Sequence, residues 1–240
     1  LQDCILVWEI FEKAKLLDFL AFRSELTGLE MDRLGGSVAA FTNLYLPKLH
    51  RKGYVSPNLP ENGGLASPGG YVMNSKPGLY QQVLVLDFKS LYPSIIRTFK
   101  IDPLGLIEGL KNPESAIEGY RGAVFSREEH LLPDIITTLW KQRDEAKVKQ
   151  DKARSQAIKI IMNSFYGVLG SGGCPFYDTR LASSITLRGH SIMQQTAKWI
   201  ESKGIEVIYG DTDSIFVLLD SKTTNAVSYT HLTLPTNREV

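Results

Sequence analysis

The sequence is poor in cysteine, lacks a long apolar run and carries almost no net charge. Two cysteines in 240 residues cannot build a disulfide scaffold, which predicts a reducing compartment. No stretch approaches the ~20 apolar residues of a membrane span, so no membrane partner is expected. No basic segment followed by an apolar run indicates a signal peptide, and no initiator methionine opens the chain. We therefore expect a cytoplasmic protein and a piece of a longer sequence.

The charge balance excludes a strongly basic nucleic-acid binder but not one that binds through a local basic groove. The 27 Lys and Arg residues nearly match the 26 Asp and Glu residues, for a net charge of +1. A histone-like or tail-type binder would be far more basic, but a local basic groove is compatible with this balance. The hydrophobic fraction of 43% excludes wholesale disorder, and the length suits one large domain or two modest ones.

The first eighty residues predict helices followed by a connector. Apolar residues recur at helical spacing over 4–22, which indicates one or two amphipathic helices that stop at the breaker Thr27-Gly28. A shorter helix is expected after 35–37, with its apolar residues on one face. Residues 53–79 are rich in Gly and Pro and predict a connector without regular structure.

From residue 83 the pattern changes to strands and longer helices. The run 83–86 is β-branched and aliphatic, as in a buried central strand, and it ends in Asp87. Residues 134–149 and 152–169 predict a helical hairpin, and a helix over 181–203 should stop at Gly204. Two apolar strands in 205–219 flank a Gly-Asp-Thr-Asp turn, which predicts a β-hairpin with acids at its tip. The expected fold class is α+β.

Three acids lie where predicted strands leave the apolar core. Asp87 ends one strand, and Asp211 and Asp213 occupy the tip of the hairpin. Each alone is typical of an ordinary loop, cap or turn residue. If the strands are neighbours, the carboxylates converge and repel one another unless a divalent cation lies between them. Ligands that are all oxygen suit Mg²⁺, and two such ions can activate an attacking oxygen and stabilise a leaving one.

The predicted helical hairpin carries a local excess of positive charge. Between residues 139 and 160 there are seven Lys and Arg and three acids, a local net charge of +4. Arg143 and Lys147 share one helix face, and so do Lys159, Asn163 and Tyr166. A cation, an amide and an aromatic ring along one stripe would suit a nucleoside triphosphate and its base. Spacing alone slightly favours a solvated basic face, with Tyr166 at the edge of the core.

Three segments contain motifs of a known family. Residues 87–96 (Asp-Phe-Lys-Ser-Leu-Tyr-Pro-Ser-Ile-Ile) resemble motif A of family B DNA polymerases. Residues 159–167 (Lys-Ile-Ile-Met-Asn-Ser-Phe-Tyr-Gly) resemble motif B, and 209–214 (Tyr-Gly-Asp-Thr-Asp-Ser) resemble motif C. All three in this order and spacing make coincidence implausible. The flanking sequence is similar to one bacterial branch of the family, and the resemblance runs from residue 1 to about 219.

The resemblance implies a polymerase palm, an antiparallel sheet with helices, that carries a two-helix fingers insertion. It divides the chain into a helical remnant behind an exonuclease domain (1–60), a connector and first palm part with motif A (61–133), fingers with motif B (134–170), a second palm part with motif C (171–220) and a tail (221–240). From about residue 225 the tail shows no clear period and no partner element. That pattern suits foreign sequence read through at a broken gene end and a polar C-terminal tail equally well.

For the carboxylates, the resemblance implies metal binding. Asp87 and Asp213 match the two palm residues that hold the catalytic ions, with the backbone carbonyl of Phe88 as a further ligand and Asp211 as a companion acid. The implied cofactor is a pair of Mg²⁺ ions, with Mn²⁺ as a substitute.

The resemblance also implies how a nucleotide binds. The backbone amides of Ser90 and Leu91 would contact the triphosphate, and the ring of Tyr92 would pack under the deoxyribose and reject a 2′-hydroxyl. The fingers residues that match those gripping the triphosphate are Arg143, Lys147, Lys159 and Asn163. The residues implied beside the nascent base pair and the primer terminus are Tyr166, Gly167 and Tyr209.

Three places depart from the family pattern. Asp3 matches the last metal-binding acid of a 3′–5′ exonuclease, but the other exonuclease motifs are absent, so a helix-capping role is the stronger interpretation. Ser67 replaces the tyrosine of a Tyr-x-Gly-Gly motif that contacts template, which leaves Gly69 and Gly70 as the implied contacts. The Lys-x-Tyr primer-binding segment and the thumb, expected after residue 219, are missing.

The function implied is template-directed transfer of a deoxynucleotide to a primer end. The partners implied are primer–template DNA, deoxynucleoside triphosphates and a sliding clamp bound through regions outside this chain, in a bacterial cytoplasm at the nucleoid. Two alternatives stay open. A non-catalytic nucleotide- or DNA-binding fragment is expected if the missing parts are essential. A nucleotidyl cyclase also uses aspartates at strand ends, although Tyr92 and the motif B stripe argue against it.

Overall fold

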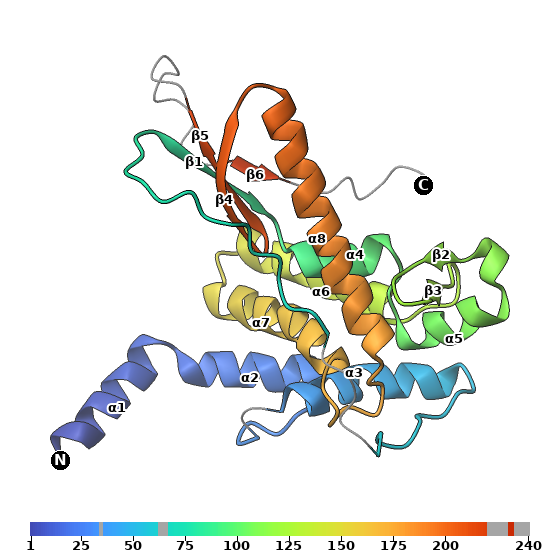
Figure 1. The fold of residues 1–240 in the computed structure, drawn as a ribbon. Coiled ribbons are helices and arrows are strands. Elements are labelled where there is room, and N and C mark those ends of the chain that lie inside the picture. Colours follow the sequence, from blue (N-terminus) through green and yellow to red (C-terminus); the bar gives the residue numbers. More distant parts are fainter. Residues whose placement is uncertain (34–35, 62–66, 220–229, 233–240) are drawn as a thin grey trace.

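The computed structural model describes residues 1–33, 36–61, 67–219 and 230–232. The fold is α+β, as expected: a small twisted sheet lies at one end, and helices extend from it toward the N-terminal helices at the other end (Figure 1). None of the described helices is long and apolar enough to cross a bilayer.

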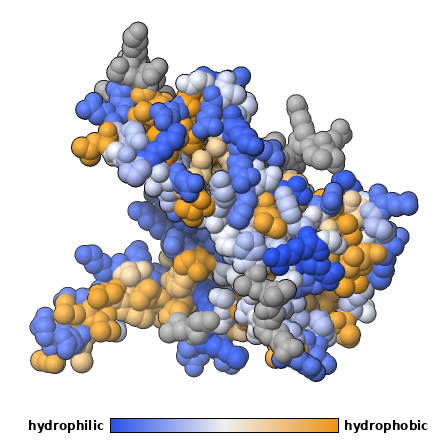
Figure 2. Space-filling model, viewed as in Figure 1, coloured by the Kyte–Doolittle hydropathy of each residue, from blue (hydrophilic) through white to orange (hydrophobic). Residues whose placement is uncertain are grey.

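Three helices form the N-terminal part. They are α1 (Gln2–Lys13), α2 (Leu16–Thr27) and α3 (Ser37–Arg51), and α2 ends at Gly28, whose φ of +68° is the left-handed conformation that suits glycine. The predicted breaker at Thr27-Gly28 is therefore confirmed. No residue of α1 is buried against the described part of the chain, and Figure 2 shows its apolar side chains on the surface. In contrast, α2 and α3 pack on α7.

The sheet has the order β4-β5-β1-β6. Strands β4 (Glu206–Asp211) and β5 (Ser214–Leu218) form the predicted hairpin, and β5 runs antiparallel to β1 (Val83–Phe88). The prediction of a buried strand over 83–86 is wrong in one respect. Strand β1 lies inside the sheet, but its residues before Phe88 are exposed or half-buried because one face of the sheet is only partly covered.

The tail also differs from expectation. No partner element was predicted for it, but β6 (Thr230–Leu232) pairs in parallel with β1, with Leu86 opposite Thr230. Strand β6 occupies the edge of β1 that faces away from β5, and without β6 this edge would be able to pair with any extended segment that reaches it. The rest of the tail, for which foreign sequence and a polar C-terminal tail stay equally open, lies outside the described residues.

The helical hairpin forms within two residues of its predicted bounds. It consists of α6 (Leu132–Val148) and α7 (Lys152–Leu169), and the Asp151 carboxylate caps α7 by accepting from the backbone N–H of Arg154 at 3.0 Å. The long helix α8 (Thr179–Ser202) ends before Gly204, whose φ is +79°. Helix α8 packs on β4, α4 and α7, so it connects the sheet with the helical hairpin.

Between β1 and α6 the chain forms short elements to which the sequence pattern assigned nothing. They are α4 (Leu91–Thr98), α5 (Pro103–Lys111), the 3-10 turn η1 (Pro113–Ser115) and the small hairpin β2 (Ile117–Glu118) and β3 (Val124–Phe125). Helix α4 packs against α6 and α8, and it places the residues after Asp87 between the sheet and the helical hairpin.

One buried carboxylate joins three of these helices. Asp102 is fully buried, and its two oxygens accept hydrogen bonds from the backbone N–H of Gly105 and of Leu132, both at 2.7 Å. The hydroxyl of Tyr45, on α3, also donates to Asp102 and accepts from the N–H of Leu104 at 3.0 Å. Asp102 therefore holds the starts of α5 and α6 against α3. Burial raises its pKa, and these hydrogen bonds act in the opposite direction.

Candidate active site

The strand register brings the three predicted acids to one place. Asp87 near the end of β1 lies opposite Ser214 at the start of β5, and the Ser214 hydroxyl donates to the Asp87 carboxylate at 3.1 Å. The next N–H, that of Phe88, donates to the carbonyl of Asp213 at 2.8 Å. The predicted convergence of the two strand ends is thus confirmed.

The turn between β4 and β5 is tight and strained. Thr212 has a φ of +51°, which is costly for a residue with a Cβ, and the N–H of Asp213 donates to the carbonyl of Asp211 at 2.6 Å. The Thr212 hydroxyl donates to the Asp211 carboxylate at 2.9 Å, which is ordinary turn chemistry for Asp211. Asp213 differs from it, because its pKa is raised by burial and by the negative charges of Asp87 and Asp211.

The chemistry of these donors fits a hard divalent cation, since they are all oxygen and mutually repulsive. Burial raises the pKa of Asp213 most, and the negative charges of Asp87 and Asp211 raise it further. Within the ranges that the structure describes, no group of three or more His, Cys, Asp or Glu side chains is arranged as a ready metal site. The carboxylates are therefore neighbours without being drawn together as a ligand set.

The start of α4 faces this carboxylate cluster. Ser90, the residue before α4, has a φ of +52°, and its side chain does not cap the helix. The first N–H groups of a helix have no partner within the helix and carry a partial positive charge. The Leu91 side chain is buried and fixes the turn to the core. This backbone is suited to an anion beside Asp87.

Two aromatic rings close the other side of the same turn. The ring centroids of Tyr92 on α4 and Tyr166 on α7 are 4.8 Å apart. Burial, followed by the charges of Tyr166, Asp213 and Asp211, raises the pKa of Tyr92 to about 12, so its hydroxyl is neutral at physiological pH. Next to Tyr166, Gly167 is exposed and leaves open space where a Cβ would be.

Positive side chains reach the same turn from the helical hairpin. Arg143 on α6 donates from Nη1 to the hydroxyl of Ser90 at 3.4 Å, and its Nε is buried without a partner in the described part of the chain. The pKa of Lys147 is lowered by burial and then by the positive charges of Arg143, Lys89 and Lys159. Three positive side chains thus act on Lys147, whose Nζ also lies 3.9 Å from the Asp144 carboxylate, and a bound anion would lower the remaining repulsion.

The α7 stripe also lies as predicted. Lys159 and Asn163 are exposed and Tyr166 is half-buried, whereas the opposite side of α7 is buried through Ile158, Ile161, Met162 and Phe165. The exposure of Lys159 and Asn163 therefore agrees with the solvated basic face that spacing alone slightly favours. The electrostatic effect of Lys159 on Lys147 connects this face with α6.

The segment 67–73 lies across the turn of the hairpin like an added strand. The N–H of Thr212 donates to the carbonyl of Tyr71, and the N–H of Met73 donates to the carbonyl of Gly210, both at 2.8 Å. A Cβ at Gly70 would lie 2.3 Å from the Thr212 hydroxyl, so only glycine fits there, whereas Gly69 has open space. The carbonyl of Gly69 is 2.8 Å from Nε2 of His190 on α8.

Two further contacts hold this segment in place. Ser67, which stands where a tyrosine was expected, lies 3.3 Å from the hydroxyl of Ser183 on α8. The Tyr166 hydroxyl donates to the carbonyl of Pro68 at 3.4 Å. The segment therefore joins the hairpin, α7 and α8.

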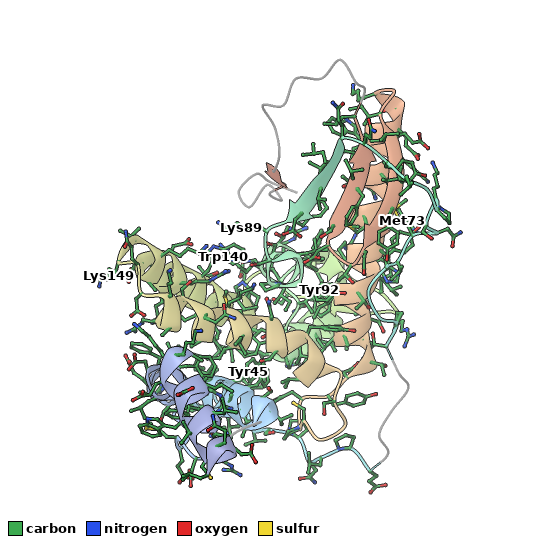
Figure 3. The ribbon with its side chains drawn as sticks, turned by 90° about the vertical axis from the view of Figure 1, so that its left-hand side faces the viewer. Tyr45, Met73, Lys89, Tyr92, Trp140 and Lys149 are labelled. Carbon is green, nitrogen blue, oxygen red and sulfur yellow. The ribbon has the colours of Figure 1, made fainter. Side chains whose placement is uncertain are left out.

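Of two further predicted residues, one lies beside the acids and the other lies far from them. Tyr209 is on β4 with its ring 5.5 Å from that of Phe216, beside a cavity of about 290 Å³ lined also by Asp211 and Asp213. Asp3 is exposed in the first turn of α1, at the far end of the molecule from the sheet (Figures 1 and 3). Asp3 is therefore not brought together with the other acids.

Sequence reasoning missed three residues at the site: Lys89, Trp140 and His190. Lys89 stands inside motif A, and Trp140 is three residues before Arg143, at helical spacing. The motif and the spacing could therefore have pointed to these two residues. His190 lies on α8, outside the three motifs. The contacts of these residues join parts of the chain that are far apart, which periodicity does not reveal.

Comparison with known proteins agrees with this arrangement. A model of DNA polymerase family B matches residues 35–234. DNA polymerase II of Escherichia coli (strain K12) is 62% identical over 221 residues, which cover 91% of this chain and 28% of that protein. The DNA polymerase alpha catalytic subunit of Arabidopsis thaliana is 39% identical over 166 residues, which cover 64% of this chain and 10% of that protein.

A solved structure has a similar fold. The family B DNA polymerase from the archaeon Pyrobaculum calidifontis aligns with a TM-score of 0.68 and 31% identity, over 87% of this chain and 30% of that one. The chain thus spans less than a third of the length of these relatives. Since the family model matches most of the residues, the chain belongs to DNA polymerase family B.

Proposed function

We propose that the chain is the palm and fingers part of a DNA-directed DNA polymerase. The palm would comprise residues 61–133 and 171–220, and the fingers residues 134–170, behind a helical remnant at 1–60. The observation that carries the proposal is the contact of Arg143 with Ser90, which joins the basic hairpin to the residue before α4, three positions after Asp87. Cations and carboxylates on opposite sides of one turn suit a nucleotide with its metal ions.

Asp87, Asp213 and the carbonyl of Phe88 would hold two Mg²⁺ ions, or Mn²⁺ in their place, with Asp211 as a companion acid. When bound, such ions polarise the phosphate and lower the pKa of the attacking hydroxyl. The closeness of Asp87 and Asp211 supports this role, because their negative charges add to the effect of burial on the pKa of Asp213 and a cation would offset those charges.

The protein's own groups would position the nucleotide. The N–H groups of Ser90 and Leu91, with Arg143, Lys147, Lys159 and Asn163, would hold the triphosphate. The primer 3′-hydroxyl would lose its proton to water and its oxygen would bond to the α-phosphorus, while the bond from the α-phosphorus to the bridging oxygen of the β-phosphate breaks and releases pyrophosphate. Most of the catalysis would be orientation and charge stabilisation.

The remaining residues would select and align the substrates. The ring of Tyr92 would exclude a ribose 2′-hydroxyl, and Tyr166 with Gly167 would line the new base pair. Tyr209 would support the primer end, and Gly69 with Gly70 would contact template. In the whole polymerase the partners would be primer–template DNA, deoxynucleoside triphosphates and a sliding clamp, in the bacterial cytoplasm.

Primer extension tests the proposal. The 240-residue chain and its Asp213→Asn variant are compared with Mg²⁺ and all four deoxynucleotides, beside Asp32→Asn, which removes an exposed acid outside the site. Extension that is lost in Asp213→Asn and kept in Asp32→Asn supports the assignment. Extension that Asp213→Asn retains contradicts it.

A second candidate is a nucleotide- or DNA-binding fragment without catalysis. It is favoured by the short span of the chain, 28% of the E. coli relative. A folded chain that binds nucleotide but extends no primer would support it. The same Asp213→Asn substitution is then made in the complete polymerase, where abolished extension assigns the site.

A further inference from the structure

Trp140 on α6 brings two cations together at the junction of palm and fingers. Nζ of Lys89 lies 5.7 Å from the centroid of its ring, and the guanidinium carbon of Arg97 lies 5.0 Å from it. Figure 3 shows Lys89 and Trp140 beside each other where the turn after β1 meets α6. Arg97 also donates from Nε to the Thr137 hydroxyl at 3.1 Å, which fixes it as a structural contact.

Lys89 is held differently from Arg97. No ion pair or hydrogen bond joins its Nζ to another side chain in the described ranges, so its charge is not neutralised by a carboxylate. A ring face attracts an ammonium group without cancelling its charge. Trp140 can therefore orient Lys89 and leave it able to bind an anion.

The position of Lys89 points to the anion site already described. It directly precedes Ser90, and its charge is among those that lower the pKa of Lys147. Trp140, Arg143 and Lys147 follow at spacings of three and four along α6, so they share one face. Lys89 lies against Trp140, the first residue of that stripe.

The two ends of the site differ in chemistry. Tyr92 contacts Tyr166 on α7, and a pair of rings suits a sugar and a base. Lys89 contacts Trp140 on α6, where Arg143 and Lys147 add charge without another aromatic partner for a base. A nucleotide that places its sugar at Tyr92 would therefore direct its outer phosphates toward Lys89.

We propose that Lys89, oriented by Trp140, binds the β- and γ-phosphates of the incoming nucleotide and the pyrophosphate that leaves. The inference rests on the proposed function and adds a cation to the site. It predicts that Lys89 distinguishes ligands by their phosphates: Lys89 contributes to the binding of pyrophosphate and triphosphates and does not contribute to the binding of monophosphates.

Binding measurements on the 240-residue chain test this. Calorimetry with Mg²⁺ compares inorganic pyrophosphate, a deoxynucleoside triphosphate and the matching monophosphate. Lys89→Met should weaken binding of pyrophosphate and triphosphate about tenfold, as expected for one charge-assisted contact, and leave the monophosphate unchanged. Lys203→Met is the matched control, because Nζ of Lys203 lies 5.8 Å from the ring of Trp199 at the far end of α8. It should change none of the three affinities.

The role of Trp140 has its own readout. The chain has three tryptophans, so Trp8→Phe with Trp199→Phe leaves Trp140 as the sole emitter. Pyrophosphate should change its fluorescence, because the ammonium over the ring moves toward the anion. Trp140→Leu should weaken pyrophosphate binding by about threefold, and Lys89→Met should add less than its full tenfold effect to it.

The outcomes separate this inference from the proposed function. If the wild-type chain binds no triphosphate, both fail. If it binds and Lys89→Met binds pyrophosphate equally well, or loses monophosphate to the same degree, the role of Lys89 is wrong and the proposed function stands. An unchanged Trp140 signal with weakened binding in Lys89→Met overturns the part assigned to Trp140.

Discussion

Tyr92 stands between the carboxylate cluster and the fingers, and its surroundings keep it neutral and fixed. Its pKa of about 12 results first from burial, and its ring lies against Tyr166 on one side. On another side, a Cβ at Gly189 of α8 would be 3.4 Å from the Tyr92 ring, so α8 lies close to this ring as well. A ring packed this closely cannot move aside for an extra hydroxyl, which is the physical basis of the proposed sugar selection.

Replacing this ring should relax sugar selection. In the complete polymerase, Tyr92→Ala should raise the efficiency of ribonucleotide incorporation relative to deoxyribonucleotide by about 10- to 200-fold, because one lost steric contact has that effect on discrimination. Single-nucleotide extension assays measure the ratio. Tyr92→Phe keeps the ring and should keep the preference. An unchanged ratio in Tyr92→Ala would exclude the proposed role.

Individual site residues could be predicted where their role follows from a local motif. The acids at 87, 211 and 213 came from strand ends, and the structure brings these strand ends together. The α7 stripe came from helical spacing, and of its residues Tyr166 contacts Tyr92. Lys89 and Trp140 could not be paired in this way, because they are 51 positions apart and their contact depends on how α4 turns the chain. The contacts of Ser67 with Ser183 and of His190 with Gly69 also join residues that are distant in sequence, so the sequence pattern could not pair them.

At the scale of elements, Asp102 joins α3, α5 and α6. Its two oxygens accept from two backbone N–H groups and from Tyr45, so a neutral amide could not replace it without turning its NH₂ toward a donor. The start of the fingers thus depends on one buried side chain. The Asp-Pro pair predicted no such role, because the partners at 45 and 132 are distant in sequence.

Substitutions at this junction should destabilise the fold. Asp102→Asn should lower the free energy of unfolding by about 2–4 kcal/mol, since it leaves a buried N–H without an acceptor. Tyr45→Phe should cost about 1–2 kcal/mol through its lost hydrogen bonds. Urea denaturation measures both, and the double variant should lose less than the sum. Additive losses would show that the two residues act independently.

The pH dependence of Tyr45→Phe gives a check with a defined sign. Burial, then the charge of Asp102, raises the pKa of Tyr45 well above 10, so the unfolded chain loses this proton first as the pH rises. The free energy of unfolding should therefore fall with pH above about 10 in the wild type. Tyr45→Phe has no such proton and should lose less stability across that interval.

Long periodic elements were predicted well and short ones were not. Helices α6, α7 and α8 and the β4–β5 hairpin formed close to their expected bounds, because each has a sustained apolar period and a clear stop. Helix α4 was missed since Pro93 and the β-branched pair Ile95-Ile96 argue against a helix locally, and packing against α6 and α8 decides the outcome. The pairing of β6 with β1 had no local signal.

At the scale of the whole molecule, the N-terminal helices differ in how they are attached. Helix α2 packs along α7, and Arg154 on α7 lies over the ring of Phe22 and within 3.4 Å of the Glu25 carboxylate. Helix α1 extends beyond this contact with its apolar residues exposed, among them Ile5, Val7, Trp8 and Ile10. The hydrophobic core begins at Phe41 on α3, and α2 packs against it through the half-buried Leu26.

Truncation should separate the two helices. Removal of residues 1–14 should change the melting temperature by less than about 2 °C, because no residue of α1 is buried in the described structure. Removal of residues 1–28 should lower it by more than about 5 °C, since the packing of α2 on α7 is lost. Thermal unfolding followed by circular dichroism measures both. A large loss from the shorter truncation would show that α1 is part of the cooperative unit.

The bond between Ser214 and Asp87 spans 127 positions, and this separation has a consequence for how the chain forms during synthesis. The helical hairpin needs only nearby contacts and can fold while the ribosome is still translating, whereas β1 has to wait for β5. At about 5–20 residues per second the wait is roughly 6–25 s. During that interval β1 has an unpaired edge on the side that β5 will occupy. A nascent chain that stalls before residue 214 would expose this edge to chaperones and to other nascent chains.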